Sequence, residues 1–319
     1  MDKSFIQTPT ESIVTNYHKP IEYADRQLEI LWLPGEINVE KDVQSILVDM
    51  TPSEKHGVLT TLRLFTLYEL KAGNEYWNGR FRDILPRPEF QRMASVFGMF
   101  ESAVHAPFYN KLNEALNVAT DEFYLDYVND PDLKARMEFI DEALSDPDEL
   151  FSLGVFSMIE GAVLYSSFAF LKHFQANGKN KINNVVRGIA FSVRDESLHA
   201  EAGAWCFKTL KKEAKLTSPN DRLKQAARVI YEHECLIIDK VFSQGEISGI
   251  TPEALKAFVA HRVNLCLKNL GLGYAVIEHL DESVANWFYK DTVGYVSNDF
   301  FAGVGKEYKR NWNESAFTW

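Results

Sequence analysis

Six long segments with the apolar spacing of helices constrain the fold of this chain more than any other feature. These segments cover about residues 51–77, 88–117, 146–176, 181–212, 218–242 and 251–270. Five of them open at or beside a proline, which is favoured in the first turn of a helix. Most are about twice as long as the average globular helix of roughly 11–12 residues. No Asn-Gly or Asp-Gly turn joins two alternating β-branched runs, so the pattern predicts an all-α helical bundle.

The composition is that of a globular protein in a reducing compartment. Among 319 residues, 34 Lys and Arg stand against 45 Asp and Glu, so the formal net charge is −11. This balance argues against nucleic acid or an anionic membrane surface as the main partner. The three cysteines are far apart and odd in number, which disfavours a disulfide framework and predicts a cytoplasmic location. The most apolar stretch, residues 150–170, contains Glu160 and predicts a buried helix rather than a membrane span.

The C-terminal end departs from the helical pattern. After Gly305 the sequence KEYKRNWNESAFTW is basic, then aromatic, and shows no helical stripe. A frayed terminus is the usual fate of such tails. However, the tail has more large aromatic side chains than an inert terminus needs, namely Tyr308, Trp312, Phe317 and Trp319. We therefore predict one helical domain over residues 1–303 and a flexible tail over 304–319 that docks on a partner.

A Glu-x-x-His pair lies in the fourth helical segment. Glu196 and His199 are about 300° apart on a helix, so they share one face and can bind one ion. Alone this spacing is weak evidence, because capping or surface pairs show it too. Glu160 lies in the nearly wholly apolar segment 156–165. A buried carboxylate there needs a proton, a strong donor or a cation.

The same arrangement occurs earlier in the chain. Glu69 lies in the apolar segment 62–70, and His105 follows with Glu101 one helical turn before it. For each carboxylate alone, a satisfied core or surface role is the commoner explanation. Together, four carboxylates and two imidazoles on four helices match the ligand set of dimetal carboxylate sites in ferritin-like bundles. Oxygen-rich ligands with two imidazoles suit iron or manganese better than zinc. The predicted metal ligands are Glu69, Glu101, His105, Glu160, Glu196 and His199.

The spacing of Glu101 and His105 predicts a local distortion of their helix. The two residues are four apart instead of three, and Pro107 follows two residues later. A π-bulge somewhere in 102–107 would absorb the extra residue, and such bulges are frequent at functional sites.

From about Tyr23 to about Tyr308, the sequence resembles the radical-generating small (β) subunit of class I ribonucleotide reductase. Residues 32–36, Trp-Leu-Pro-Gly-Glu, resemble the family's Trp-x-Pro-x-Glu element, whose Trp relays the radical. Asp195, directly before the ligand Glu196, resembles the family aspartate that hydrogen-bonds both a metal-ligating His and that Trp. We choose His105 as this histidine and expect Trp32, Asp195 and His105 to form a relay.

The resemblance also implies roles for two tyrosines. Tyr109 stands four residues after His105, where the family carries its radical-bearing tyrosine. Tyr308 in the tail resembles the C-terminal relay tyrosine, with Trp312 as a rival.

The register of the radical position leaves alternatives open. Counting from Glu101 with the usual spacing would place Phe108 at the radical position. Counting from His105 gives Tyr109 but places Ser102 at the carboxylate position, and we favour this register with a distortion that brings Glu101 to the metal. Ser192 is polar where the family usually keeps the pocket of the radical apolar. The stored oxidant is therefore left open between a tyrosyl radical, an iron/manganese pair and a dimanganese centre.

The resemblance implies a ferritin-like bundle with two metal ions per chain (Fe/Fe, Mn/Fe or Mn/Mn), activated by an oxygen species. It implies that a one-electron oxidant passes to a catalytic α subunit, which reduces ribonucleotides to deoxyribonucleotides. The expected assembly is a cytoplasmic homodimer that is active only with α, bound through the tail. The need for an activating flavoprotein, the choice of oxygen or superoxide, and a diphosphate or triphosphate substrate stay open.

Two other interpretations bear on these expectations. The alternative function is another ferritin-like dimetal oxygenase or oxidase acting on its own bound substrate. Such a protein would share the ligands without needing Trp32 or an aromatic tail. Three other tryptophans, Trp77, Trp205 and Trp287, are interpreted as packing residues.

Overall fold

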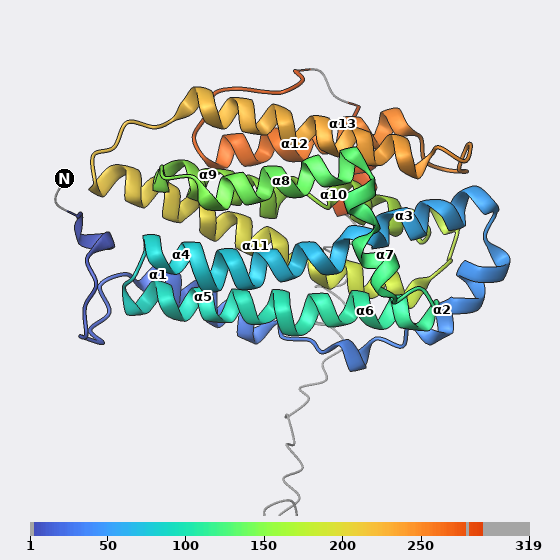
Figure 1. Cartoon of the computed structure of the whole chain (residues 1–319), viewed down its shortest axis with the longest axis horizontal. Helices are drawn as coiled ribbons and strands as arrows, with labels where there is room; N and C mark the ends of the chain where they lie inside the picture. The colour runs from blue at the N-terminus through green and yellow to red at the C-terminus, as the bar shows by residue number, and fades with distance from the viewer. Residues whose placement is uncertain (1–2, 279–280, 290–319) are drawn as a thin grey trace, which may run out of the picture.

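The computed structural model describes residues 3–278 and 281–289, and every regular element in these ranges is a helix. The long helices lie side by side along the longest axis of the molecule (Figure 1). The predicted all-α helical bundle is therefore confirmed. The predicted division into a domain over 1–303 and a tail over 304–319 falls at a boundary outside the described residues, as do Tyr308 and Trp312.

The predicted metal ligands are carried by a core of helices that run through the middle of the molecule. These are α3 (Pro52–Leu70), α5 (Pro88–Phe100), α6 (Ala106–Ala115), α9 (Glu149–Ala162) and α11 (Asn183–Glu213). The remaining helices surround them. They are α1 (His18–Glu29), α2 (Glu40–Gln44), α4 (Phe81–Ile84), α7 (Asp121–Leu125), α8 (Pro131–Ser145), α10 (Tyr165–Lys172), α12 (Asn220–Val241) and α13 (Pro252–Asn269).

Helix α3 begins where its sequence places the start signals. Thr51 is the N-cap, and its hydroxyl accepts a hydrogen bond from the backbone N–H of Glu54 at 3.2 Å. In return, the Glu54 carboxylate accepts from the Thr51 N–H at 2.9 Å, which completes a capping box. Pro52 occupies the first helical position, where its missing N–H costs nothing. Beyond Leu70 the helix continues as a π-helical segment, Lys71–Arg80, which the sequence analysis does not anticipate.

The segment predicted as one helix over 146–176 is interrupted in the structure. Helix α9 ends at Ala162, Val163 is extended, and Leu164 has a left-handed backbone with φ 71° before α10 begins at Tyr165. No proline lies near this point, and the isolated Gly161 is equally compatible with a continuous helix, so the sequence pattern does not show the interruption.

The stretch Glu149–Lys172 is long and apolar enough to cross a membrane, but its most apolar part is entirely buried inside the bundle. It is a core element of the fold, as the sequence analysis predicts.

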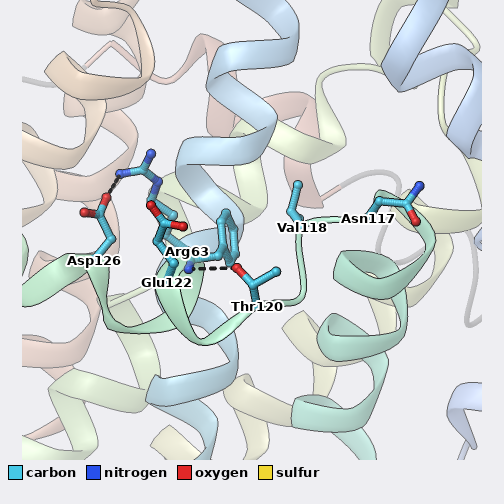
Figure 2. A pocket seen from close by; sticks show the side chains of 7 residues that line it. Arg63, Asn117, Val118, Thr120, Glu122 and Asp126 are labelled. Atoms are coloured by element: carbon cyan, nitrogen blue, oxygen red, sulfur yellow. Dashed lines mark hydrogen bonds and ion pairs between the residues drawn. The ribbon is translucent and has the colours of Figure 1, made fainter.

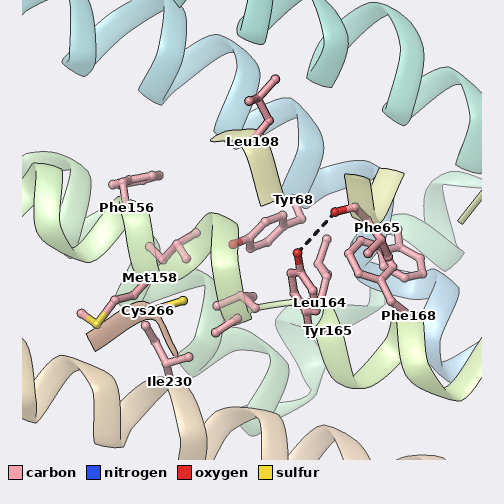
Figure 3. Close-up of a cluster of buried hydrophobic side chains, with 14 of the residues drawn as sticks. Phe65, Tyr68, Phe156, Met158, Leu164, Tyr165, Phe168, Leu198, Ile230 and Cys266 are labelled. Carbon is pink, nitrogen blue, oxygen red and sulfur yellow. Dashed lines mark hydrogen bonds between the residues drawn. The ribbon is translucent and has the colours of Figure 1, made fainter. Parts of the chain in front are cut away.

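Aromatic side chains fill the core beside the ligand-bearing helices. The Phe65 ring stacks on Tyr109, with ring centroids 4.4 Å apart, and on Phe168, with centroids 5.5 Å apart. Tyr68 and Tyr165 lie in the same buried cluster (Figure 3). This packing excludes water from the end of α3 that carries Glu69.

Candidate metal centre

The six predicted ligands converge in the interior of the bundle. Each of them has at most 4% of its surface exposed, so none is a solvated surface group. One ligand ends α3, two lie on the segment between α5 and α6, one lies in the last turn of α9, and two lie on α11. The structure thus brings together Glu69, Glu101, His105, Glu160, Glu196 and His199, as the sequence analysis predicts.

The ligand atoms form two overlapping groups. In each group, one atom from every residue lies within 4.8 Å of the others. The first group contains Glu69 and His105, and the second contains Glu160 and His199. Glu101 and Glu196 belong to both groups. Two adjacent cation sites that share two carboxylates are the arrangement of a carboxylate-bridged dimetal centre.

The two shared carboxylates span the two histidines. Glu101 Oε1 lies 2.6 Å from His199 Nδ1, and Glu101 Oε2 lies 3.0 Å from His105 Nδ1. Glu196 Oε1 lies 3.3 Å from His105 Nδ1, and Glu196 Oε2 lies 3.8 Å from His199 Nδ1. Each carboxylate therefore directs one oxygen at each half of the site.

The other two carboxylates each face one histidine. Glu69 Oε2 lies 3.7 Å from His105 Nδ1, and Glu160 Oε2 lies 3.3 Å from His199 Nδ1. Both imidazoles therefore point Nδ1 into the cluster, which leaves Nε2 for other contacts.

A π-helical turn brings Glu101 to the cluster. The turn covers Glu101–His105, overlapping the predicted 102–107 distortion, and separates α5 from α6. Gly73, in the facing π-helical segment, permits this geometry because a β-carbon there would lie 2.8 Å from Glu101 Cβ. Sequence spacing predicts the wide turn, but the glycine that accommodates it is visible only in three dimensions.

Burial and mutual charge perturb the titration of the cluster. Burial and the Glu101 carboxylate raise the pKa of Glu69 and of Glu196 well above the ordinary range. Burial opposes the ionised form of Glu101, but the neighbouring His105 and His199 outweigh it and hold the Glu101 pKa well below that range. The Glu101 and Glu160 carboxylates outweigh burial at His199 and raise its pKa to about 9.

The cluster fits a pair of metal ions on the evidence of its own unsatisfied atoms. Glu69 Oε1 is buried and has no hydrogen-bond partner in the described part of the chain. Glu101 Oε1 and Glu196 Oε1 face only imidazole nitrogens, at 2.6 and 3.3 Å. Four carboxylates gathered out of water around two imidazoles are costly, and divalent cations relieve that cost. The oxygen-rich donor set suits iron or manganese.

The predicted Trp32–Asp195–His105 relay is a continuous chain of hydrogen bonds. Trp32 Nε1 donates to Asp195 Oδ2 at 2.8 Å, and His105 Nε2 lies 3.1 Å from the same oxygen. All three side chains are buried. The Trp32 and His105 rings also stack, with centroids 5.9 Å apart. The geometry therefore agrees with the choice of His105 as the histidine that contacts Asp195.

Tyr109 lies in a dry pocket beside the cluster, where its hydroxyl donates to Ser192 Oγ at 3.1 Å. Burial and the Glu69 carboxylate raise the pKa of the Tyr109 phenol well above its ordinary value. Phe108 instead packs edge-on against Trp32, with centroids 5.5 Å apart. The His105 register therefore gives the tyrosine that lies near the ligands.

The structure corrects the interpretation of Trp77 as a packing residue alone. It is fully buried, and its Nε1 donates to Glu160 Oε1 at 2.9 Å. Its ring also meets His199 edge-on, with centroids 5.7 Å apart. No local sequence signal marks this role, because the partner lies 83 residues away.

A surface pocket of about 330 Å³ lies apart from these residues, between the middle of α3 and the segment 117–126 that includes α7 (Figure 2). None of the predicted ligands or relay residues lines it. One of its walls carries the Arg63–Asp126 ion pair, with 2.8 Å between nitrogen and oxygen. This pocket is therefore separate from the predicted metal centre.

The helical bundle and its cluster of shared carboxylates define the class of ferritin-like proteins whose ligand sets are typical of dimetal carboxylate sites. A family model for the ribonucleotide reductase small chain matches residues 12–275. The chain belongs to this family and is the radical-generating small subunit of a ribonucleotide reductase. The match favours this function over a ferritin-like oxygenase acting on its own substrate.

Relatives of known family agree with this assignment. The chain is 26% identical to a probable ribonucleoside-diphosphate reductase small subunit of Invertebrate iridescent virus 3, over 82% of this chain and 76% of the relative. It is 24% identical to the ribonucleoside-diphosphate reductase subunit beta of Mycoplasmoides gallisepticum, over 92% and 86%.

Among solved structures, the fold resembles the R2 subunit from Clostridium botulinum, with a TM-score of 0.77, 19% identity and coverage of 87% and 89%. It also resembles the dimanganese(II) form of NrdF from Streptococcus sanguinis, with a TM-score of 0.74, 20% identity and coverage of 90% and 99%. These likenesses confirm the predicted ferritin-like fold.

Proposed function

We propose that this small subunit binds two ions of iron or manganese between its four ligand-bearing helices. Glu69 and His105 would hold one ion, and Glu160 and His199 would hold the other. Glu101 and Glu196 would bridge the pair. The observation that carries this assignment is that these two carboxylates alone belong to both ligand groups.

The bound ions would supply the one-electron oxidising power that no side chain has by itself. The protein supplies the surroundings. Packed aromatic rings keep water away from Tyr109, and the Ser192 hydroxyl oxygen accepts a hydrogen bond from the Tyr109 phenol. Tyr109 is the residue that we assign to storage of the oxidant, since its phenol lies in this dry pocket beside the Glu69 carboxylate.

Trp32, Asp195 and His105 would link the metal site to the surface. The shared Asp195 oxygen accepts from Trp32 and contacts His105, so a proton and an electron can shift together along three side chains. The neighbours Leu31 and Leu33 are each more than 40% exposed, which places Trp32 just below the surface. Tyr308 would continue this relay in the tail, which would dock on the large α subunit.

The expected substrates are ribonucleoside diphosphates, in agreement with the names of the relatives. The expected assembly is a cytoplasmic homodimer with α. The solved dimanganese relative supports manganese as one of the metals to test.

Two variants test the relay and the tail. Replacing Trp32 by Phe removes the donor to Asp195, so turnover with α should stop while metal content stays as in the wild type. Normal turnover by this variant would remove Trp32 from the relay.

Deleting the tail from Gly305 onward should abolish activity with α at unchanged metal content, and retained activity would refute the proposed docking role of the tail.

A further inference from the structure

The helix that carries Glu160 ends two residues after this ligand. Val163 is extended and Leu164 adopts a left-handed backbone, so the last carbonyl groups of α9 lose the N–H donors of a continuing helix. Glu160 therefore projects from a helical turn that needs support from outside its own helix.

Arg262 on α13 supplies that support. It is buried, with 5% of its surface exposed, and its Nε donates to the Gly161 carbonyl at 2.9 Å. A cationic side chain at the C-terminal end of a helix also has a favourable interaction with the helix dipole. The guanidinium thus replaces the missing backbone donor directly after Glu160.

Two further contacts fix the guanidinium. Its Nη1 donates to the Tyr289 hydroxyl at 3.0 Å, and its Cζ lies 3.8 Å from the centre of the Tyr165 ring. The Tyr165 hydroxyl lies 2.9 Å from Ser197 Oγ, on the residue after the ligand Glu196. Arg262 therefore contacts structure that adjoins a ligand on α9 and a ligand on α11.

The backbone at Gly161 is packed closely between neighbouring helices. A β-carbon there would lie 2.4 Å from Cys266 Sγ and 3.1 Å from Ala200 Cβ. Small movements of the Gly161 peptide are therefore resisted on this side, and Arg262 fixes its carbonyl from α13.

A purely stabilising ion pair does not explain Arg262. Within the described ranges, no carboxylate lies within ion-pair distance of its guanidinium. Burying a cation without an anion is costly, so an ion pair is not what keeps a guanidinium at this position. The guanidinium is placed where it holds a carbonyl beside a ligand.

We propose that Arg262 is a positioning residue that orients Glu160 for the second metal ion, with Tyr289 as its anchor. This inference rests on the proposed ligand assignment. It adds a residue 102 positions after Glu160, and residues 283–289, to the parts of the chain that set the geometry of that half of the site.

The test is a Mn(II) titration of the full-length protein, followed by electron paramagnetic resonance and by thermal unfolding. The wild type should bind two Mn(II) per chain and show the signature of a coupled pair. In Arg262→Gln, the first ion should bind as in the wild type, and the second about 10–100-fold more weakly, the usual cost of losing an outer contact to a metal ligand. A mononuclear Mn(II) signal should replace the coupled one at intermediate metal concentrations.

Matched variants separate positioning from stability. Arg228→Gln removes an exposed guanidinium that donates to the Tyr274 hydroxyl, in the irregular segment after α13, so it should leave the binding of both ions unchanged. Tyr289→Phe removes only the hydroxyl that anchors the guanidinium, so it should lower the affinity for the second ion by less than Arg262→Gln does. Arg262→Lys keeps the charge but offers no planar fork, so it should rescue only in part.

The outcomes are distinguishable. A wild type that fails to bind two Mn(II) overturns the ligand assignment itself. Coupled, wild-type binding of both ions by Arg262→Gln overturns the positioning role alone. If Arg262→Gln does not fold, Arg262→Lys and Tyr289→Phe decide, and wild-type binding of the second ion by both overturns the proposal.

Discussion

The two halves of the metal centre use the same ligand types but differ in what surrounds them. In the first half, His105 Nε2 contacts Asp195, which in turn accepts a hydrogen bond from Trp32. In the second half, His199 Nε2 is buried and has no hydrogen-bond partner among the described residues. There the outer contact falls on the carboxylate, because Trp77 donates to Glu160.

This difference assigns the halves different tasks. The first half has a hydrogen-bonded route out of the core, and in the proposed function it would exchange protons and electrons with Trp32. The second half has no such route within the described chain, and its outer contacts fix the carboxylate that binds the ion. In the proposed function, Glu101 and Glu196 would join a half that serves transfer to a half that retains its ion.

The largest effect should come from a change that damages both halves. Glu101→Ala removes a bridging carboxylate and leaves His105 and His199 without their nearest anion. We expect affinity for both ions to fall by more than about 100-fold, beyond the usual cost of an outer contact. Elemental analysis after equilibration with Mn(II) measures this loss. Glu201→Ala, on α11 outside the cluster, is the control, and an equal loss there would undermine the comparison.

A change at Asp195 should affect the first half selectively. Asp195→Asn keeps the shape but replaces the shared anionic oxygen, so it weakens the contacts to both Trp32 and His105. Turnover with α should fall about 10–100-fold, while the ion held by Glu160 and His199 binds as before. Steady-state assays and Mn(II) titration measure the two effects. Weaker binding of the second ion alone would show that the halves are not separable in this way.

A smaller effect on the second half is expected from Trp77→Phe. The variant keeps an aromatic ring but loses the donor to Glu160, so the second ion should bind about tenfold more weakly. Isothermal titration with Mn(II) resolves the two binding steps. Trp205 is a partly buried tryptophan on α11, and the control variant Trp205→Phe should leave both Mn(II)-binding steps unchanged. If both variants behave alike, the hydrogen bond to Glu160 has no special role.

The smallest effect concerns pH and the metal-free protein. Neighbouring carboxylates raise the His199 pKa from 6.5 to about 9, so this histidine adds stability below pH 6.5. That contribution is lost as the pH rises through about 9, because the folded state then releases a proton that it binds more tightly than the unfolded state. We expect the melting temperature of metal-free protein to fall by roughly a few degrees over this window. Mn(II)-loaded protein, in which the imidazole is neutral and bound, should not show this decline.

Much of the centre is predictable because its signals are local. Glu196 and His199 share a helix face by spacing, and Glu160 stands out as a charge in an apolar run. The extra residue between Glu101 and His105 predicts the wide turn that the structure shows. Each inference needs only residues within one helix.

The supporting contacts are not predictable in this way. Trp77 reaches Glu160 across 83 residues, and Arg262 reaches Gly161 across 101. The interruption after Ala162 lies in an apolar run where Gly161 is only a weak break signal, because an isolated glycine is also tolerated inside a helix. Such contacts depend on how helices cross, which hydrophobic periodicity does not encode.

The central claim is that Glu101 and Glu196 bridge two ions held by two unlike halves. A crystal structure of the full-length protein grown with excess Mn(II), with anomalous data, tests it most directly. We expect two anomalous peaks per chain about 3.5–4 Å apart, with both carboxylates contacting both ions. A single peak, or Glu101 turned away from the second ion, would contradict the account.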